Sequence, residues 1–123
     1  MDQFNQAPAP TQEEFDALSG SVDNYSTTET IVGTFNGVPL YRRLYPYTNV
    51  TMAKNTNVLL TGDLPTSFSN IKRIYGTIMS PNAFIASESA YVYFNIMPSG
   101  IYVRQLVTET ASFTVYAVVE YTK

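Results

Sequence analysis

Apolar and polar residues alternate along most of the chain from residue 30 onward, and turn-forming residues separate the alternating runs. Alternation with a period of two is typical of strands that bury one face. Besides a hairpin within residues 25–45, the expected strands are 50–53, 57–61, 71–79, 91–97, 101–108 and 112–121. The segments 46–49, 62–65, 80–82 and 98–100 are predicted to be turns. About seven short strands at this spacing predict a mainly β fold, an antiparallel β-sandwich or jelly roll.

The hairpin is centred on Asn36-Gly37, the dipeptide best suited to a two-residue type I′ turn. The cross-strand pairs that follow from this turn are Phe35–Val38, Thr34–Pro39, Gly33–Leu40 and Val32–Tyr41. The face predicted to lie on the core carries Ile31, Phe35, Val38, Leu40 and Leu44. At the rim of that face, Glu29 is predicted to pair with Arg42.

The chain divides into an N-terminal segment, residues 1–24, and a β domain, residues 25–123. The segment is predicted to be extended at first and then helical, because Thr11-Gln12-Glu13-Glu14 reads as a capping box. Three apolar residues then recur at helical spacing: Phe15, Leu18 and Val22. A helix this short is marginal alone in water, so it needs a partner surface. That surface is either the axis of a trimer, with these three residues as oligomer contacts, or the chain's own β domain.

Low charge sets this chain apart from most soluble domains. Hydrophobic residues make up 45% of the 123 residues and charged residues only 14%, where about a quarter is usual. Either other subunits cover much of the surface, or Thr, Ser and Asn supply the solubility. The last expected strand, 112–121, is apolar on both faces, so it should be internal or covered by a neighbouring subunit.

The sequence lacks residues that several classes of function require. The chain has no Cys and no His, which removes disulfides, thiolate metal sites and the commonest general base. The carboxylates are scattered and form no catalytic motif, so no catalytic residue, metal site or cofactor is expected. Residues 1–30 carry a charge of −6 and the remainder +3. A pI near 4.7 without a basic stripe argues against nucleic acid, and neither a membrane span nor a secretory signal is predicted.

Aromatic residues gather in two places. Tyr91, Tyr93, Tyr102 and Arg104 lie on either side of the turn at 98–100. Tyr41, Arg42, Arg43, Tyr45 and Tyr47 lie at the end of the hairpin. Aromatic rings stack on sugar rings and Arg supplies hydrogen bonds, so a glycan-binding or receptor-binding surface is one interpretation of the first group. The other is that these side chains fill the core and subunit interfaces, where Tyr and Arg are enriched.

The hairpin also carries a family resemblance. The segment YSTTETIVGTFNGVPLYRR resembles one that recurs in tail-fibre, head-fibre, baseplate and other appendage proteins of bacteriophages and prophages. The matching residues are Tyr25, Ser26, Thr27, Glu29, Gly33, Thr34, Gly37, Pro39, Leu40, Tyr41 and Arg42. Two positions depart from the pattern: Phe35 stands where Trp is usual, and plain Asn36-Gly37 replaces a basic turn.

This resemblance implies a virion protein made in the cytoplasm of a bacterial host. The expected function is a non-enzymatic head- or tail-fibre-like appendage that attaches to the host surface through the β domain, with a surface glycan as the candidate receptor. Its expected partners are other virion proteins and copies of itself in a trimer. The alternative is a purely structural virion component, a capsid decoration or baseplate protein without a receptor-binding role. A small carbohydrate-active enzyme is a third alternative.

Overall fold

The computed structural model describes residues 25–81, 83–87 and 89–123. Within these residues the chain forms eight β-strands and a short 3-10 helix at Phe68–Asn70. The strands are β1 (Thr30–Phe35), β2 (Val38–Met52), β3 (Val58–Thr61), β4 (Ile71–Ser80), β5 (Ala83–Ala86), β6 (Val92–Met97), β7 (Gly100–Gln105) and β8 (Ala111–Tyr121). The prediction of a mainly β fold is therefore confirmed. The N-terminal segment and its predicted helix lie outside the described residues.

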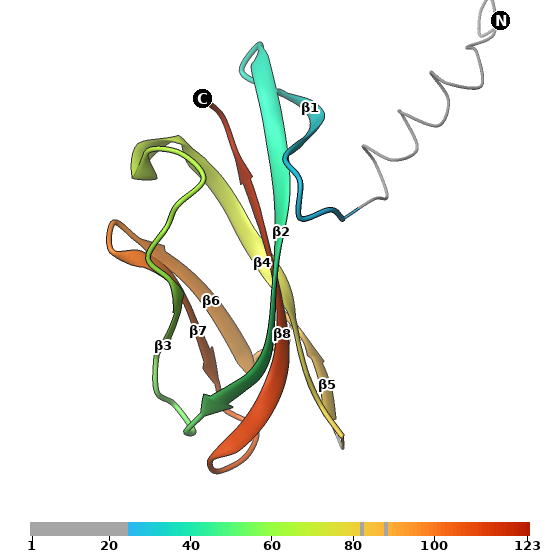
Figure 1. Cartoon of the computed structure of the whole chain (residues 1–123), viewed down its shortest axis with the longest axis vertical. Helices are drawn as coiled ribbons and strands as arrows, with labels where there is room; N and C mark the ends of the chain where they lie inside the picture. The colour runs from blue at the N-terminus through green and yellow to red at the C-terminus, as the bar shows by residue number, and fades with distance from the viewer. Residues whose placement is uncertain (1–24, 82, 88) are drawn as a thin grey trace, which may run out of the picture.

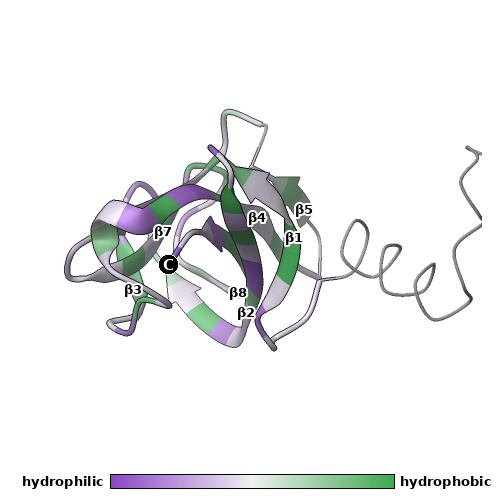
Figure 2. Cartoon of the chain, turned by 90° about the horizontal axis from the view of Figure 1, so that it is seen from above, coloured by the Kyte–Doolittle hydropathy of each residue, from purple (hydrophilic) through white to green (hydrophobic). Residues whose placement is uncertain are grey.

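Two antiparallel sheets curl into a half-barrel (Figures 1 and 2). The five-stranded sheet has the order β1-β2-β8-β4-β5, and the three-stranded sheet has the order β3-β7-β6. Seen from above in Figure 2, β3 and β7 lie on the opposite side of the fold from β1, β4 and β5. The finer prediction of a β-sandwich or jelly roll goes beyond this architecture and stays a prediction.

The core lies between the two sheets and is built around β8. Five alternate residues of β8 are buried on its inner face: Phe113, Val115, Ala117, Val119 and Tyr121. Val92, Ile101 and Val103 from the three-stranded sheet are buried in the same two core clusters. Since β8 pairs with β2 on one side and β4 on the other, the prediction that it is an internal strand is confirmed.

The hairpin forms as its turn predicts, up to one bulge. Asn36 and Gly37 have φ values of 53° and 82°, as a type I′ turn requires. Three of the predicted pairs are confirmed: Phe35–Val38, Thr34–Pro39 and Gly33–Leu40. The fourth pair is wrong, because a bulge after Ile31 leaves Val32 without a partner and sets Ile31 opposite Tyr41.

The sheet buries the face of this hairpin opposite to the predicted one. Tyr45 is buried, and Tyr41 and Tyr47 pack against the core, whereas Ile31 is 53% exposed and Val38 45%. The prediction fails because a tyrosine ring can be buried while its hydroxyl stays at the rim, so both faces of this hairpin offer apolar surface.

β2 continues through residues 46–49, which were predicted to be a turn. Pro46 and Tyr47 pair with β8, and the register shifts once before Val50 resumes the pairing. Asn49 takes up the extra length with a positive φ of 55°. Pro46 is tolerated because the pairing of β1 with β2 reaches no further than Arg42. At Pro46, the side of β2 that faces β1 is therefore an edge of the sheet. The segment 50–53 is thus the end of β2 and not a separate strand.

Two differences near the core follow from local contacts. β5 was not predicted; its four residues pair with the end of β4. β7 ends at Gln105 and not at residue 108, because the fully buried Gln105 side chain fixes the following loop. Its Oε1 accepts hydrogen bonds from the N–H groups of Val107 and Thr108 (2.7 and 3.1 Å), and its Nε2 donates to the Thr108 carbonyl (2.8 Å).

The entry of the chain into β1 is tied to the C-terminus. Glu29 accepts a hydrogen bond from the Tyr121 hydroxyl, and its carboxylate lies 2.6 Å from Nζ of Lys123. The hydrogen bonds from Lys123 and Tyr121 lower the pKa of Glu29. The predicted pair between Glu29 and Arg42 is therefore wrong; Arg42 pairs with Glu120.

Candidate functional site

The solvent face of the three-stranded sheet carries three of the four residues predicted to bind a glycan: Tyr93, Tyr102 and Arg104. The turn at Pro98–Ser99 pairs β6 with β7 so that Tyr93 lies opposite Arg104 and Asn95 lies opposite Tyr102. Residues 101, 103 and 105 of β7 are buried. Because successive side chains of a strand alternate, Tyr102 and Arg104 lie on the opposite, outer face.

Contacts within this face hold its polar groups in place. The guanidinium carbon of Arg104 lies 4.9 Å from the ring centroid of Tyr93, within the range of a cation–π interaction. Nε of Arg104 is buried and has no hydrogen-bond partner among the described residues. The Tyr102 hydroxyl lies 2.8 Å from Oγ of Ser99, with which it shares a hydrogen bond. The rings and the guanidinium are thus positioned by the sheet and not by a flexible loop.

Tyr91 lies beside this face in the turn before β6. It is 58% exposed. Its N–H donates to Oγ of Ser89 at 3.2 Å, and its carbonyl accepts from the N–H of Leu106 at 2.9 Å. Tyr91 therefore flanks the paired strands, and the structure does not place it in the ladder with the other three residues.

The chemistry of this face is that of binding. Tyr93, Asn95, Tyr102 and Arg104 supply two aromatic rings, an amide and a cation, a combination that can stack on a sugar ring and hydrogen-bond to its hydroxyls. None of these side chains is a carboxylate, so the face itself offers no acid–base pair for glycoside hydrolysis. In the part of the chain that the structure describes, no three His, Cys, Asp or Glu residues lie close enough to hold a metal ion.

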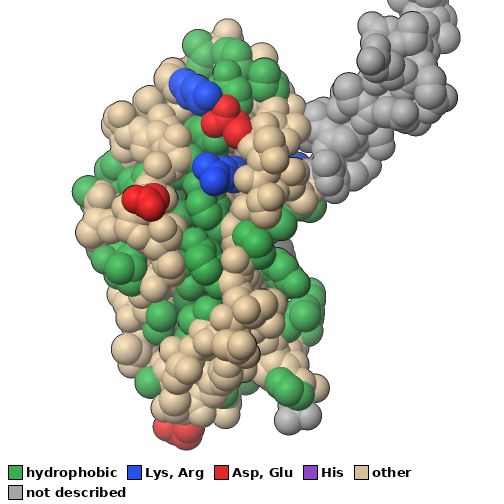
Figure 3. Space-filling view, in the orientation of Figure 1, with side chains coloured by type: hydrophobic (Ala, Val, Ile, Leu, Met, Phe, Trp, Pro, Cys, Tyr) green, Lys and Arg blue, Asp and Glu red, His purple; other side chains and the backbone are tan. Residues whose placement is uncertain are grey.

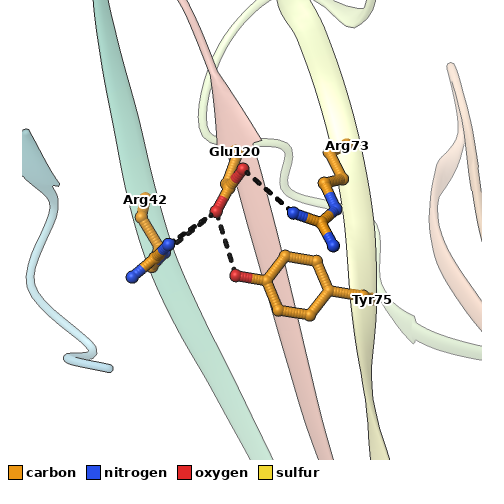
Figure 4. Close-up of polar contacts among 4 residues, drawn as sticks. All are labelled: Arg42, Arg73, Tyr75 and Glu120. Atoms are coloured by element: carbon orange, nitrogen blue, oxygen red, sulfur yellow. Dashed lines mark hydrogen bonds and ion pairs between the residues drawn. The ribbon is translucent and has the colours of Figure 1, made fainter. Parts of the chain in front are cut away.

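A second polar cluster lies on the outer face of the five-stranded sheet (Figure 4). Glu120 of β8 accepts hydrogen bonds from Nε of Arg42 (3.0 Å) and from the Tyr75 hydroxyl (2.9 Å). Nη1 of Arg73 lies 4.0 Å from the other carboxylate oxygen. The Arg42 and Glu120 side chains are only 12% and 7% exposed, whereas Arg73 is 64% exposed. The cluster joins β2, β8 and β4, so we assign it a structural role.

Sequence reasoning did not find this cluster, although one signal was present. Glu120 is the only charged residue in the apolar run 111–121, and a carboxylate in such a run is usually paired. Its partners could not be named from the sequence, because Tyr75 and Arg42 lie 45 and 78 residues away.

The predicted cluster at the end of the hairpin is divided by the sheet. Tyr41, Tyr45 and Tyr47 pack into or against the core. Arg42 lies on the other face with Glu120, and the Arg43 guanidinium lies 5.1 Å from the Tyr45 ring. These residues do not form one exposed aromatic surface.

Burial raises the pKa of four tyrosines, Tyr45, Tyr47, Tyr75 and Tyr121. A hydrogen bond to the Glu120 carboxylate adds to the effect at Tyr75, as one to Glu29 does at Tyr121. A phenol with a raised folded-state pKa contributes stability that is complete below about pH 10 and is lost as the pH rises through the folded-state value.

We therefore expect phenolate absorbance to rise in two steps during alkaline titration. The chain has ten Tyr and no Trp, so no tryptophan absorbance overlaps the phenolate absorbance. The second step should coincide with loss of the β-sheet circular dichroism, because ionising the four phenols whose pKa the fold raises destabilises the folded state. Tyr121→Phe should reduce the second step by one phenol of the four. Ionisation of all ten tyrosines while the circular dichroism stays native would contradict this expectation.

The predicted oligomer contacts, Phe15, Leu18 and Val22, lie outside the described residues, so the structure does not place them. Among the residues that it does describe, no helix is long and apolar enough to cross a membrane. Comparison of the chain with protein-family models, with curated proteins and with solved structures finds no match in any of the three.

Proposed function

We propose that this chain is a non-enzymatic virion appendage protein of a bacteriophage or prophage, which attaches to the host surface through its β domain. The class of protein rests on the resemblance of residues 25–43 to phage appendage proteins. The observation that supports attachment is the solvent face of the three-stranded sheet, where Tyr93 is paired with Arg104 beside Asn95 and Tyr102. The proposed ligand is a host-surface glycan.

The remaining features of the proposal concern assembly. The protein would be made in the bacterial cytoplasm and reside in the virion as a homo-oligomer, a trimer, in contact with other virion proteins. Its two antiparallel sheets would belong to the β-sandwich or jelly-roll class. Light scattering tests the assembly, because a monomer has a mass of 13.7 kDa; a monomer at micromolar concentration would remove the trimer and leave the binding face untouched.

A purely structural virion role is the second candidate, and one observation favours it. Charged side chains are only 14% of the chain, and Figure 3 shows how sparse they are on one face of the molecule, where hydrophobic side chains form a band. Surfaces of this kind are usually covered by neighbours. A capsid decoration or baseplate protein would use them for assembly alone.

Binding to immobilised bacterial surface polysaccharides and to whole cells separates the two candidates. The wild-type protein should bind at least one polysaccharide, and Tyr93→Ala or Arg104→Ala should weaken that binding about tenfold, since each removes one stacking or cation contact worth about 1–2 kcal/mol. Phe84→Ala is the matched control, because Phe84 is an exposed aromatic residue on the five-stranded sheet and should leave the affinity unchanged. If the wild-type protein binds no polysaccharide and no cells, the structural role is favoured.

A further inference from the structure

Beside the Glu120 cluster, part of the outer face of the five-stranded sheet is largely apolar across four strands. The register sets Leu44 beside Val118 and Val118 beside Tyr75, and in the next row it sets Tyr116 beside Thr77 and Thr77 beside Ala86. These side chains line a groove of about 370 Å³. The other face of the same sheet already packs on the core. A sheet with two apolar faces is normally covered on both.

The chain enters the domain at one end of this groove. Tyr25 lines it and makes an edge-to-face contact with Tyr75, with ring centroids 6.5 Å apart. The Arg42 guanidinium lies 4.8 Å from the Tyr25 ring. The N–H of Leu44 donates to the Ser26 carbonyl at 2.8 Å, which fixes this entry against β2. Tyr25, the first described residue, therefore lies at the mouth of the groove.

Charge favours an acidic occupant. The Glu120 cluster forms the row beside Leu44, Val118 and Tyr75 on the same face, and there two guanidinium groups, Arg42 and Arg73, face one carboxylate. Residues 1–24 contain Asp2, Glu13, Glu14, Asp16 and Asp23 and no Lys or Arg. The segment outside the described residues thus carries the charge opposite to the net charge of the row beside the groove.

We propose that residues 11–22 of the same chain lie in this groove as an amphipathic helix, with Phe15, Leu18 and Val22 on the sheet. A twelve-residue helix is about 18 Å long, and four adjacent strands at about 4.8 Å spacing span about 14 Å, so one such helix covers β2, β8, β4 and β5. Only Asp23 and Asn24 separate it from Tyr25. This short tether gives the helix an effective concentration in the millimolar range at its own groove.

This proposal does not depend on the proposed function. It selects one of the two surfaces that the sequence offers to the short helix, the chain's own β domain and not the axis of a trimer. Docking on the sheet would also supply the tertiary contact without which so short a helix is marginal.

Disulfide trapping in the full chain tests the proposal directly, because the natural chain has no Cys. Leu18→Cys combined with Thr77→Cys should give an intramolecular disulfide of monomer mass in non-reducing electrophoresis and mass spectrometry. The control pair, Leu18→Cys with Thr56→Cys, places the second thiol in the exposed loop between β2 and β3 and should cross-link at least several-fold less. Equal yields for the two pairs would overturn the proposal. So would a cross-link between two copies, which would assign the groove to a neighbouring subunit.

A fluorescence measurement gives a second, independent readout if the double-cysteine variant does not fold. The chain contains no Trp, so Phe15→Trp reports on one position. Its emission should be blue-shifted in the native protein, and adding Ala86→Glu should shift it towards the emission of the denatured chain. Leu59→Glu, on β3 of the other sheet and 51% exposed before substitution, should leave the emission unchanged. Emission of Phe15→Trp that is the same in native and denatured protein would overturn the proposal.

Discussion

Glu120→Ala is expected to lower the free energy of unfolding by about 3–5 kcal/mol, because breaking a buried ion pair by removing one partner is strongly destabilising. Arg42 loses two close contacts: its side chain is 12% exposed, and both its Nε and its Nη2 lie within 3.0 Å of the Glu120 carboxylate. The Tyr75 hydroxyl loses its acceptor as well. Chemical denaturation followed by circular dichroism measures the loss.

Arg73→Ala is the control for this prediction. Arg73 reaches the same carboxylate at 4.0 Å, but its side chain is 64% exposed. An exposed pair of this kind contributes about 1 kcal/mol or less, so Arg73→Ala should be close to wild type. The double variant Arg42→Met with Glu120→Leu should recover much of the loss, since apolar replacements of a buried pair are often neutral. Equal losses for Glu120→Ala and Arg73→Ala would show that burial does not set the strength of this cluster.

Local signals in the sequence predicted the elements that depend on local chemistry. Asn36-Gly37 fixes the hairpin, because few other dipeptides accept a positive φ at both positions of the turn. The run 112–121 predicted an internal strand, since apolar residues on both faces require cover on both. The turn at Pro98–Gly100 predicted that Tyr93 lies near Arg104, because a tight turn between two strands determines which residues lie opposite each other.

The parts that could not be predicted depend on contacts between distant segments. The hairpin buries Tyr41 and Tyr45 and leaves Ile31 exposed, which the pattern alone could not decide because both faces carry apolar surface. The continuation of β2 through Pro46 depends on β8, a strand that lies some seventy residues further along the chain. Glu120 finds its partners on two other strands, so no local spacing reveals them.

These long-range contacts also connect the candidate surfaces. β8 is the central strand: its inner face carries the core, and its outer face carries both Glu120 and part of the apolar groove. The proposed glycan face lies on the other sheet, which contacts β8 through core residues such as Val103. Substitutions on the outer face of β8 should therefore change stability or docking without altering the solvent face of β6 and β7.

Gly76→Ala is expected to destabilise the fold by about 2–3 kcal/mol, the cost of forcing extra atoms into a packed site. A Cβ at Gly76 would lie 1.9 Å from the Tyr116 carbonyl oxygen and 3.1 Å from Cα of Ala117, both backbone atoms of β8. β8 cannot move away easily, because β2 holds it on the other side. Nor can β4 withdraw freely, since the Ser87 N–H donates to the Gly76 carbonyl at 2.9 Å. Thermal and chemical denaturation measure the effect.

Gly62→Ala is the matched control for Gly76→Ala. The nearest atom to a Cβ at Gly62 is the Ser99 carbonyl oxygen at 3.6 Å, an ordinary van der Waals distance. Gly62 does not require a positive φ, so alanine should leave stability unchanged or raise it by about 0.4–1 kcal/mol through the lower entropy of the unfolded chain. The two substitutions add the same methyl group, so any difference between them reports the contact with β8. If both variants unfold at the same denaturant concentration, β4 and β8 do not approach each other as closely as the structure requires.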